Sequence, residues 1–136
     1  QLATAVLYQS PIQHFGLTPN NLEEQPSFAI DFLRRVPVVW DETRFIAGYP
    51  GRFVVLARRH GDCWFVAATN GEAEPRKLSL SAPFLEGETL TLIHDQPDRR
   101  AARRTITVGS RGRFDLDLEP AGGAVLYQQP PAQGEP

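Results

Sequence analysis

The chain has 136 residues, of which 41% are hydrophobic and 22% are charged, as expected for about one globular domain. Its formal net charge of −2 provides no overall field that would attract nucleic acid or an anionic membrane. No apolar run approaches the roughly 18 residues that a membrane-spanning helix needs. Cys63 is the only cysteine, which excludes an intrachain disulfide and a thiolate metal cluster.

The first part of the chain is predicted to contain two helices and a short strand. Alanine-rich composition favours a helix over residues 1–9, and the alternation at 10–15 is typical of one buried strand. Apolar residues at helical spacing then predict a helix over 26–36. They are Phe28, Ile30, Phe32, Leu33 and Val36. Pro37 ends this helix, because proline removes a backbone donor.

From residue 38 onwards the pattern changes to strands. Apolar and polar residues alternate in seven or eight short segments separated by turn signals such as Asn70-Gly71. The segments are 38–46, 52–59, 63–69, 77–82, 89–95, 105–109, 114–120 and 124–129. This spacing predicts a mostly-β fold, an antiparallel, Greek-key-like β-sandwich. The composition of 129–136 is typical of a disordered tail.

Two adjacent carboxylates, Asp41 and Glu42, lie where the helical pattern gives way to strands. Hydrolysis of a glycosidic bond needs two carboxyl groups that face each other about 5–10 Å apart. Neighbours on a strand point to opposite faces of the sheet, so these two are not expected to converge on one bond. We interpret Trp40, Asp41, Glu42 and Thr43 as a structural joint, in which the acids bind nearby arginines or backbone amides.

Other polar clusters have structural explanations that we favour. The row Asp115, Asp117 and Glu119 offers carboxylates on one strand face, but calcium sites usually gather ligands from a curved loop, so a solvated face is expected. The basic segment 98–104 lacks the interleaved aromatics of single-strand binders and is interpreted as a loop or subunit contact. The three histidines show no metal-ligand spacing. No catalytic residue and no metal ligand is therefore assigned.

Five aromatic residues could either stack on sugars or pack in the core: Trp40, Tyr49, Trp64, Phe65 and Tyr127. Packing is the default expectation, because burial of an aromatic side chain contributes strongly to stability. An exposed platform would instead indicate a free-standing carbohydrate-binding or protein-interaction module. Both hypotheses stay open on the sequence alone.

Three stretches resemble the C-terminal end of family 97 glycoside hydrolases, the α-glucosidase and α-galactosidase group. They are QLATAVLYQSPIQHFGLTP at 1–19, the segment 28–72 that contains the Trp-Asp-Glu-Thr joint, and GGAVLY at 122–127. The resemblance implies a parent enzyme with an N-terminal β-sandwich, a catalytic (β/α)8 barrel and a C-terminal β-sandwich. Residues 1–37 would be the end of the barrel, with its last strand and helix, and 38–128 the C-terminal sandwich.

The family's catalytic glutamates and calcium ligands lie upstream, so the resemblance implies a non-catalytic part of a bacterial α-glycosidase that acts on oligosaccharides. It would pack on the barrel and aid subunit association, and the parent would bind calcium and be periplasmic or secreted. Gln13 and His14 would lie near the barrel's active face and are the candidate sugar contacts. Leu17 stands where the family commonly has an acidic residue, which leaves glucoside or galactoside open. The missing methionine and signal peptide fit an excised piece.

Overall fold

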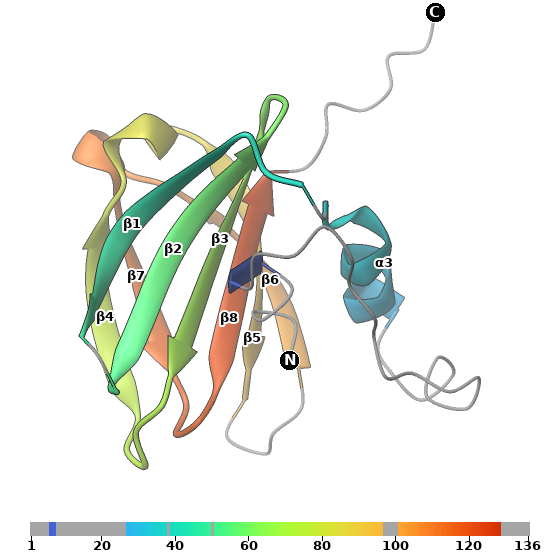
Figure 1. Cartoon of the computed structure of the whole chain (residues 1–136). Coiled ribbons are helices and arrows are strands. Elements are labelled where there is room, and N and C mark those ends of the chain that lie inside the picture. The colour runs from blue at the N-terminus through green and yellow to red at the C-terminus, as the bar shows by residue number, and fades with distance from the viewer. Residues whose placement is uncertain (1–5, 8–26, 38, 50, 97–100, 129–136) are drawn as a thin grey trace, which may run out of the picture.

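The computed structural model of the chain describes residues 6–7, 27–37, 39–49, 51–96 and 101–128. Figure 1 shows a body of long strands with a helix on one side. The strand expected at 10–15, the candidate sugar contacts Gln13 and His14, and the tail at 129–136 lie outside the described residues. Of the helix expected at 1–9, only residues 6–7 are described, and they are helical.

Helix α3 (Ser27–Arg35) occupies the segment where helical spacing predicted a helix. Its last turn carries Arg34 and Arg35, whose charges suit the negative end of the helix dipole. Phe32 is fully buried, whereas Asp31 and Arg34 are exposed. The helix therefore presents an apolar side to the strands and a charged side to water.

Eight strands follow within the described residues, and alternating polarity predicted most of them. They are β1 (Glu42–Tyr49), β2 (Phe53–His60), β3 (Cys63–Asn70), β4 (Arg76–Ser81), β5 (Thr89–Asp95), β6 (Ala101–Thr107), β7 (Arg113–Leu118) and β8 (Gly123–Gln128). All pairings are antiparallel. One sheet has six strands in the order β1-β2-β3-β8-β5-β6, and β4 pairs with β7 in a second sheet. The mostly-β, antiparallel prediction is confirmed.

The starts of two strands, β1 and β6, differ from the prediction by four residues. The first strand begins at Glu42 and not at residue 38, because Asp41 lies in a bend that bonds to the hairpin between β2 and β3. Strand β6 includes Arg103 and Arg104, which the basic composition indicated as a loop. All seven residues of β6 pair with β5, so backbone pairing places this segment in the sheet while both arginine side chains stay exposed.

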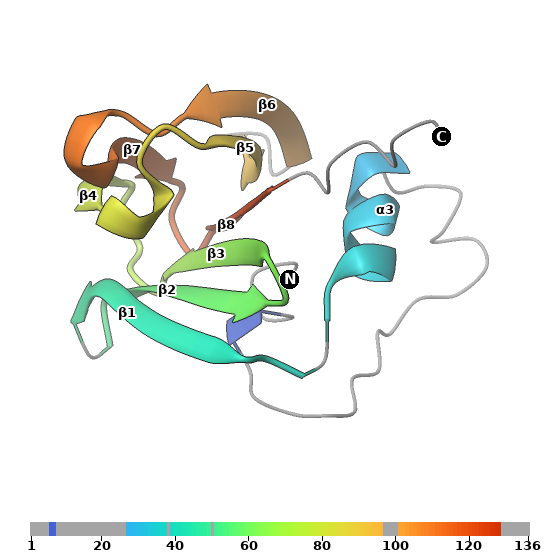
Figure 2. The same cartoon turned by 90° about the horizontal axis from the view of Figure 1, so that it is seen from above.

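The main core lies between the two sheets. Figure 2 shows the larger sheet curving, with β4 and β7 on its open side. Buried side chains from both sheets meet there, among them Val55, Val66, Leu80, Leu92, Leu116 and Leu126. Burying each such side chain contributes roughly 1.5–3 kcal/mol. This shared core holds two sheets of unequal size together, as a sandwich requires.

A second core lies on the opposite face of the six-stranded sheet, under helix α3. The ring of Phe32 lies 5.3 Å from the ring of Tyr127 and 6.2 Å from that of Phe65, between centroids. Val6 and Val125 are buried in the same cluster. Helix α3 thus covers the β3-β8-β5 part of this face. No helix among the described residues has the length and apolarity needed to cross a membrane.

Candidate functional site

The predicted joint connects helix α3 to the sheet through the turn between β2 and β3. The backbone N–H of Asp41 donates to the carbonyl of Arg59 at 2.7 Å. A carboxylate oxygen of Asp41 accepts a hydrogen bond from the backbone N–H of Gly61, also at 2.7 Å. His60 contributes a third contact, since its Nδ1 lies 2.9 Å from the carbonyl oxygen of Val39. The chain entering β1 is therefore fixed to the hairpin at three points.

Both carboxylates of the joint approach Arg59, contrary to the expectation that they would diverge. Glu42 lies 3.4 Å and Asp41 3.9 Å from nitrogens of the Arg59 guanidinium. Strand alternation does not apply to this pair, because Asp41 precedes the strand. Glu42 also accepts a hydrogen bond from Arg44 at 3.1 Å. These bonds, that from Arg44 foremost, hold the pKa of Glu42 below its ordinary value.

Trp40 and Thr43 complete the joint. The ring of Trp40 meets that of Phe65 edge-on, with centroids 5.4 Å apart, and packs against the second core. Its indole Nε1 is buried and has no hydrogen-bond partner within the described part of the chain. Thr43 is exposed on β1 opposite Arg58. With its acids committed to arginine and backbone partners, the joint offers no pair of carboxyls facing each other across an open space.

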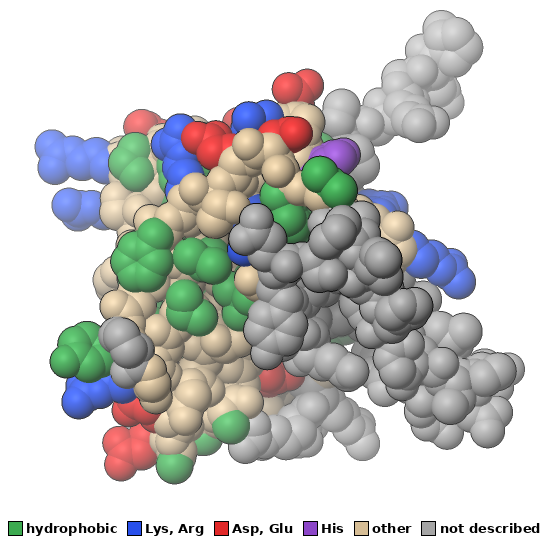
Figure 3. Space-filling view, in the orientation of Figure 1, with side chains coloured by type: hydrophobic (Ala, Val, Ile, Leu, Met, Phe, Trp, Pro, Cys, Tyr) green, Lys and Arg blue, Asp and Glu red, His purple; other side chains and the backbone are tan. Residues whose placement is uncertain are grey.

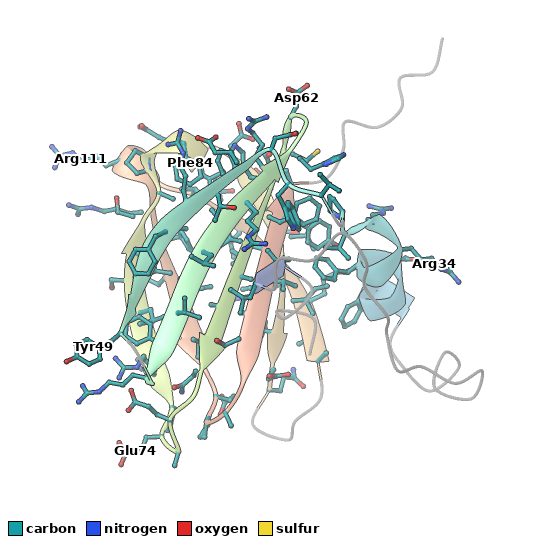
Figure 4. The ribbon with its side chains drawn as sticks, viewed as in Figure 1. Arg34, Tyr49, Asp62, Glu74, Phe84 and Arg111 are labelled. Atoms are coloured by element: carbon teal, nitrogen blue, oxygen red, sulfur yellow. The ribbon has the colours of Figure 1, made fainter. Side chains whose placement is uncertain are left out.

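The predicted aromatic set is divided among three places. Phe65 and Tyr127 are buried under helix α3, and burial raises the pKa of the Tyr127 hydroxyl. Trp64 packs on Phe84 with ring centroids 4.4 Å apart, and the Arg44 guanidinium lies 4.7 Å from the Phe84 ring. Tyr49 alone of the five is largely exposed, as Figure 4 shows at the end of β1.

The aromatic hollow is an open space at the turn end of β1 and β2. It measures about 540 Å³ and is lined by Phe45, Gly48, Tyr49, Arg52, Val54 and Thr69, among others. Phe45 is 65% exposed, and the Arg52 guanidinium lies 4.9 Å from the Tyr49 ring. Phe45 was not predicted from the sequence as a site residue. The sequence feature that could have indicated it is an aromatic residue next to Arg44 within the strand β1.

A second, smaller hollow of about 340 Å³ lies between the sheets at the β5–β6 side. His94, Asp95, Arg104, Asp117 and Glu119 line it, so two of the three acids in the predicted row face this space. Asp95 is already bonded to the backbone N–H of Gly123 at 2.9 Å. Across the described ranges, no three His, Cys, Asp or Glu side chains gather closely enough to hold a metal ion.

The basic segment is only partly described. Arg103 and Arg104 are exposed on β6, and the remaining arginines of the segment lie outside the described residues. The Arg103 guanidinium lies 5.5 Å from the Phe28 ring of helix α3. This is a cation–π contact, so the Arg103 side chain has a partner within the chain.

Comparison with known proteins gives consistent matches. The family model described as "Glycosyl-hydrolase 97 C-terminal, oligomerisation" matches residues 39–128. A retaining α-galactosidase of Bacteroides thetaiotaomicron is 30% identical over 133 residues, which are 93% of this chain and 20% of that protein. A probable retaining α-galactosidase of Streptomyces bingchenggensis is 44% identical over 102 residues, 72% of this chain and 15% of that protein.

Among solved structures, a β-arabinopyranosidase superposes with a TM-score of 0.90 at 45% sequence identity. The match covers 94% of this chain and 20% of that one. The chain thus spans no more than about one fifth of the length of these relatives. Since the family model covers well over half of the chain, the chain belongs to glycoside hydrolase family 97, and residues 39–128 are its C-terminal domain.

Proposed function

We propose that this chain is the non-catalytic C-terminal part of a bacterial glycosidase that acts on oligosaccharides. The observation that carries the proposal is the docking of helix α3 on the six-stranded sheet through Phe32, Phe65 and Tyr127. A helix that packs in this way on the outer face of a sandwich is typical of a contact with a neighbouring domain, to which the helix itself belongs. The engagement of Asp41 and Glu42 by Arg59 supports a structural role for the joint.

In this proposal residues 1–37 are the end of the catalytic (β/α)8 barrel and α3 is its last helix. Residues 38–128 are the C-terminal sandwich, and 129–136 a tail. The sandwich packs on the barrel and helps subunits associate, as the family description of oligomerisation supports. Gln13 and His14 contact sugar at the barrel's active face. The calcium of the parent enzyme is held upstream, and the parent is periplasmic or secreted.

The relatives favour a galactose-like substrate over a glucoside for the parent enzyme. Two are named as α-galactosidases, and the structure at 45% identity is a β-arabinopyranosidase. A β-L-arabinopyranoside has the ring stereochemistry of an α-D-galactoside and lacks only its hydroxymethyl group. One pocket shape can therefore bind both sugars. A glucoside differs in the orientation of one ring hydroxyl, and a site that hydrogen-bonds this hydroxyl would discriminate against it.

The test measures hydrolysis of aryl α-galactoside, β-L-arabinopyranoside and α-glucoside with calcium present. This chain alone should give no turnover with any of them, and the protein extended through its upstream region should hydrolyse the first two in preference to the third. Turnover by this chain alone that disappears in Glu42→Gln would overturn the non-catalytic assignment. Preference of the extended protein for the glucoside would overturn the substrate class.

A further inference from the structure

Asn70 ends strand β3 and holds two loops together at one end of the sandwich. Its side-chain Nδ2 donates to the carbonyl oxygen of Glu74 at 2.8 Å and to that of Glu119 at 3.3 Å. Its Oδ1 accepts a hydrogen bond from the backbone N–H of Glu72 at 3.0 Å. Figure 1 shows the β3–β4 and β7–β8 loops side by side at its lower end, where the N–H of Ala121 donates to the carbonyl oxygen of Glu72 at 3.0 Å. One amide side chain therefore ties together two connections between the larger sheet and the smaller one.

We propose that Asn70 is a site of spontaneous deamidation, which the closed loops block and their local opening permits. The residue that follows it is Gly71, which has no side chain to shield its nitrogen and lets the backbone turn towards the amide. The Gly71 nitrogen attacks Cγ of Asn70 and closes a succinimide ring. The bond from Cγ to Nδ2 breaks, and ammonia leaves with the proton of the Gly71 amide. Water then opens the ring to aspartate or isoaspartate, so the only co-reactant is water.

The folded chain blocks each part of this reaction. The attacking nitrogen is engaged, because the Gly71 N–H donates to the carbonyl oxygen of Arg52 at 2.7 Å. The backbone N–H of Asn70 donates to the carbonyl oxygen of Gly122 at 2.8 Å, which fixes the backbone that would have to turn. Asn70 is only 2% exposed, so water does not reach its amide. Deamidation therefore requires the two loops to separate, and the free energy of this opening sets its rate.

The product cannot restore the lost contacts. Aspartate and isoaspartate both carry a carboxylate, which has no N–H to donate and would face the carbonyl oxygens of Glu74 and Glu119. A buried charge without a donor costs more free energy than one missing hydrogen bond. Figure 3 shows acidic side chains at this lower end, where Figure 4 labels Glu74, and like charges add to the cost. Each conversion thus leaves the loops apart, and the smaller sheet loses its tie at this end.

The experiment follows conversion of Asn70 in the whole chain by peptide mass spectrometry, in native buffer and in urea above the unfolding midpoint. Conversion should be at least about tenfold slower in native buffer, because only the opened fraction reacts. Each further tenfold of slowing corresponds to about 1.4 kcal/mol of opening free energy. Below the midpoint the rate should change little with urea, because separation of two loops exposes little surface.

Gly71→Ala is the matched control for the chemistry. A Cβ at Gly71 would lie 3.4 Å from the carbonyl oxygen of Arg52, an ordinary contact, so the thermal midpoint should not change. The added methyl group hinders attack by the nitrogen, and conversion of Asn70 in urea should fall several-fold. Asn70→Asp places the product in the fold. At neutral pH it should lower the thermal midpoint and speed hydrogen exchange in β4 and β7 more than in β2.

Four results would overturn the inference. Equal conversion in native buffer and in urea would remove the block by the fold, and no conversion in urea would remove the site. A native rate that follows global unfolding would exclude local opening. An Asn70→Asp chain with the midpoint and exchange of the wild type would show that the product closes the loops. The rate comparison uses the wild-type chain, so it does not depend on the folding of any variant, and none of these results bears on hydrolysis.

Discussion

The carboxylate of Asp41 accepts a hydrogen bond from the backbone N–H of Gly61 at 2.7 Å, across 20 residues of sequence. This bond ties the entry of β1 to the β2–β3 turn. We expect Asp41→Ala to lower the free energy of unfolding by about 1 kcal/mol, as for loss of one charge-assisted hydrogen bond at a solvent-exposed site. Asp62→Ala, a neighbouring exposed turn residue, is the control and should change it by less than about 0.5 kcal/mol. Urea denaturation measures both, and equal losses would exclude a special role for Asp41.

The lowered pKa of Glu42 makes part of the stability depend on pH. Hydrogen bonds from Arg44 and then Arg59 favour the ionised carboxyl in the folded state. The contribution is therefore complete above the ordinary glutamate pKa of about 4.3. It is lost as the pH falls through the lowered pKa of the folded state. Glu42→Gln should flatten the acid side of the stability curve, measured by thermal unfolding from neutral pH downwards.

The control for the pH experiment is Glu74→Gln. Its side chain is exposed and makes no ion pair within the part of the chain that the structure describes. Its stability curve should follow that of the wild type. If Glu42→Gln and the wild type lose stability in parallel on acidification, the ion pairs with Arg44 and Arg59 do not stabilise the fold.

Trp40 stabilises the joint through its ring and not through its N–H. The ring packs edge-on against Phe65, while the buried Nε1 has no partner among the described residues. Trp40→Ala should cost about 2–4 kcal/mol, because Trp40 is only partly buried and large-to-small changes in full cores reach 3–5 kcal/mol. Trp40→Phe keeps most of the contact and should cost less than about 1.5 kcal/mol. An unchanged melting temperature in Trp40→Ala would contradict this account.

Helix α3 is held to the sheet by Phe32, which is fully buried. Phe32→Ala should cost about 3–5 kcal/mol and should speed hydrogen exchange along Ser27–Arg35 more than in the strands. Arg34→Ala changes an exposed residue of the same helix and should stay within about 0.5 kcal/mol of the wild type. Equal exchange of the helix amides in both variants would show that Phe32 is not the anchor.

Local patterns predicted the strands, because apolar and polar residues alternate within each short segment of sequence. The segment 89–95 is strand β5 with the same bounds, and β8 differs from its predicted range by one residue at each end. The sequence did not predict the part of β6 that contains Arg103 and Arg104. Both side chains are exposed, so apolar and polar residues do not alternate there, and the strand is defined by its backbone pairing with β5.

Relations between distant residues could not be predicted in the same way. The bond from Gly61 to Asp41 depends on where β1 begins, and the division into sheets of six and two strands depends on the return of β8 between β3 and β5. The 65% exposure of Phe45 depends on what other segments cover its side of β1, which no single stretch of sequence specifies. The predicted joint residues Trp40, Asp41 and Glu42 do lie together, whereas Gln13 and His14 stay predictions.

Among the glycines that the structure describes, Gly112 leaves the least room for a side chain. It lies in η2 (Ser110–Gly112) with a φ of +75°, and a Cβ there would come 2.1 Å from the carbonyl oxygen of Ala82. Gly87 has nearly the same φ, +78°, but nothing lies within 4 Å of its Cβ position. Alanine substitutions at the two glycines therefore distinguish the cost of backbone strain, which both share, from the cost of a steric clash with Ala82, which only Gly112 has.

Gly87→Ala should cost about 1–2 kcal/mol, the strain of a left-handed residue with a side chain. Gly112→Ala should cost at least about 3 kcal/mol, because overpacking against a fixed backbone adds to the same strain. Chemical denaturation of the two variants measures the difference directly. Equal costs would mean that η2 moves away from Ala82 without loss, and that the contact between η2 and the end of β4 does not hold the smaller sheet in place.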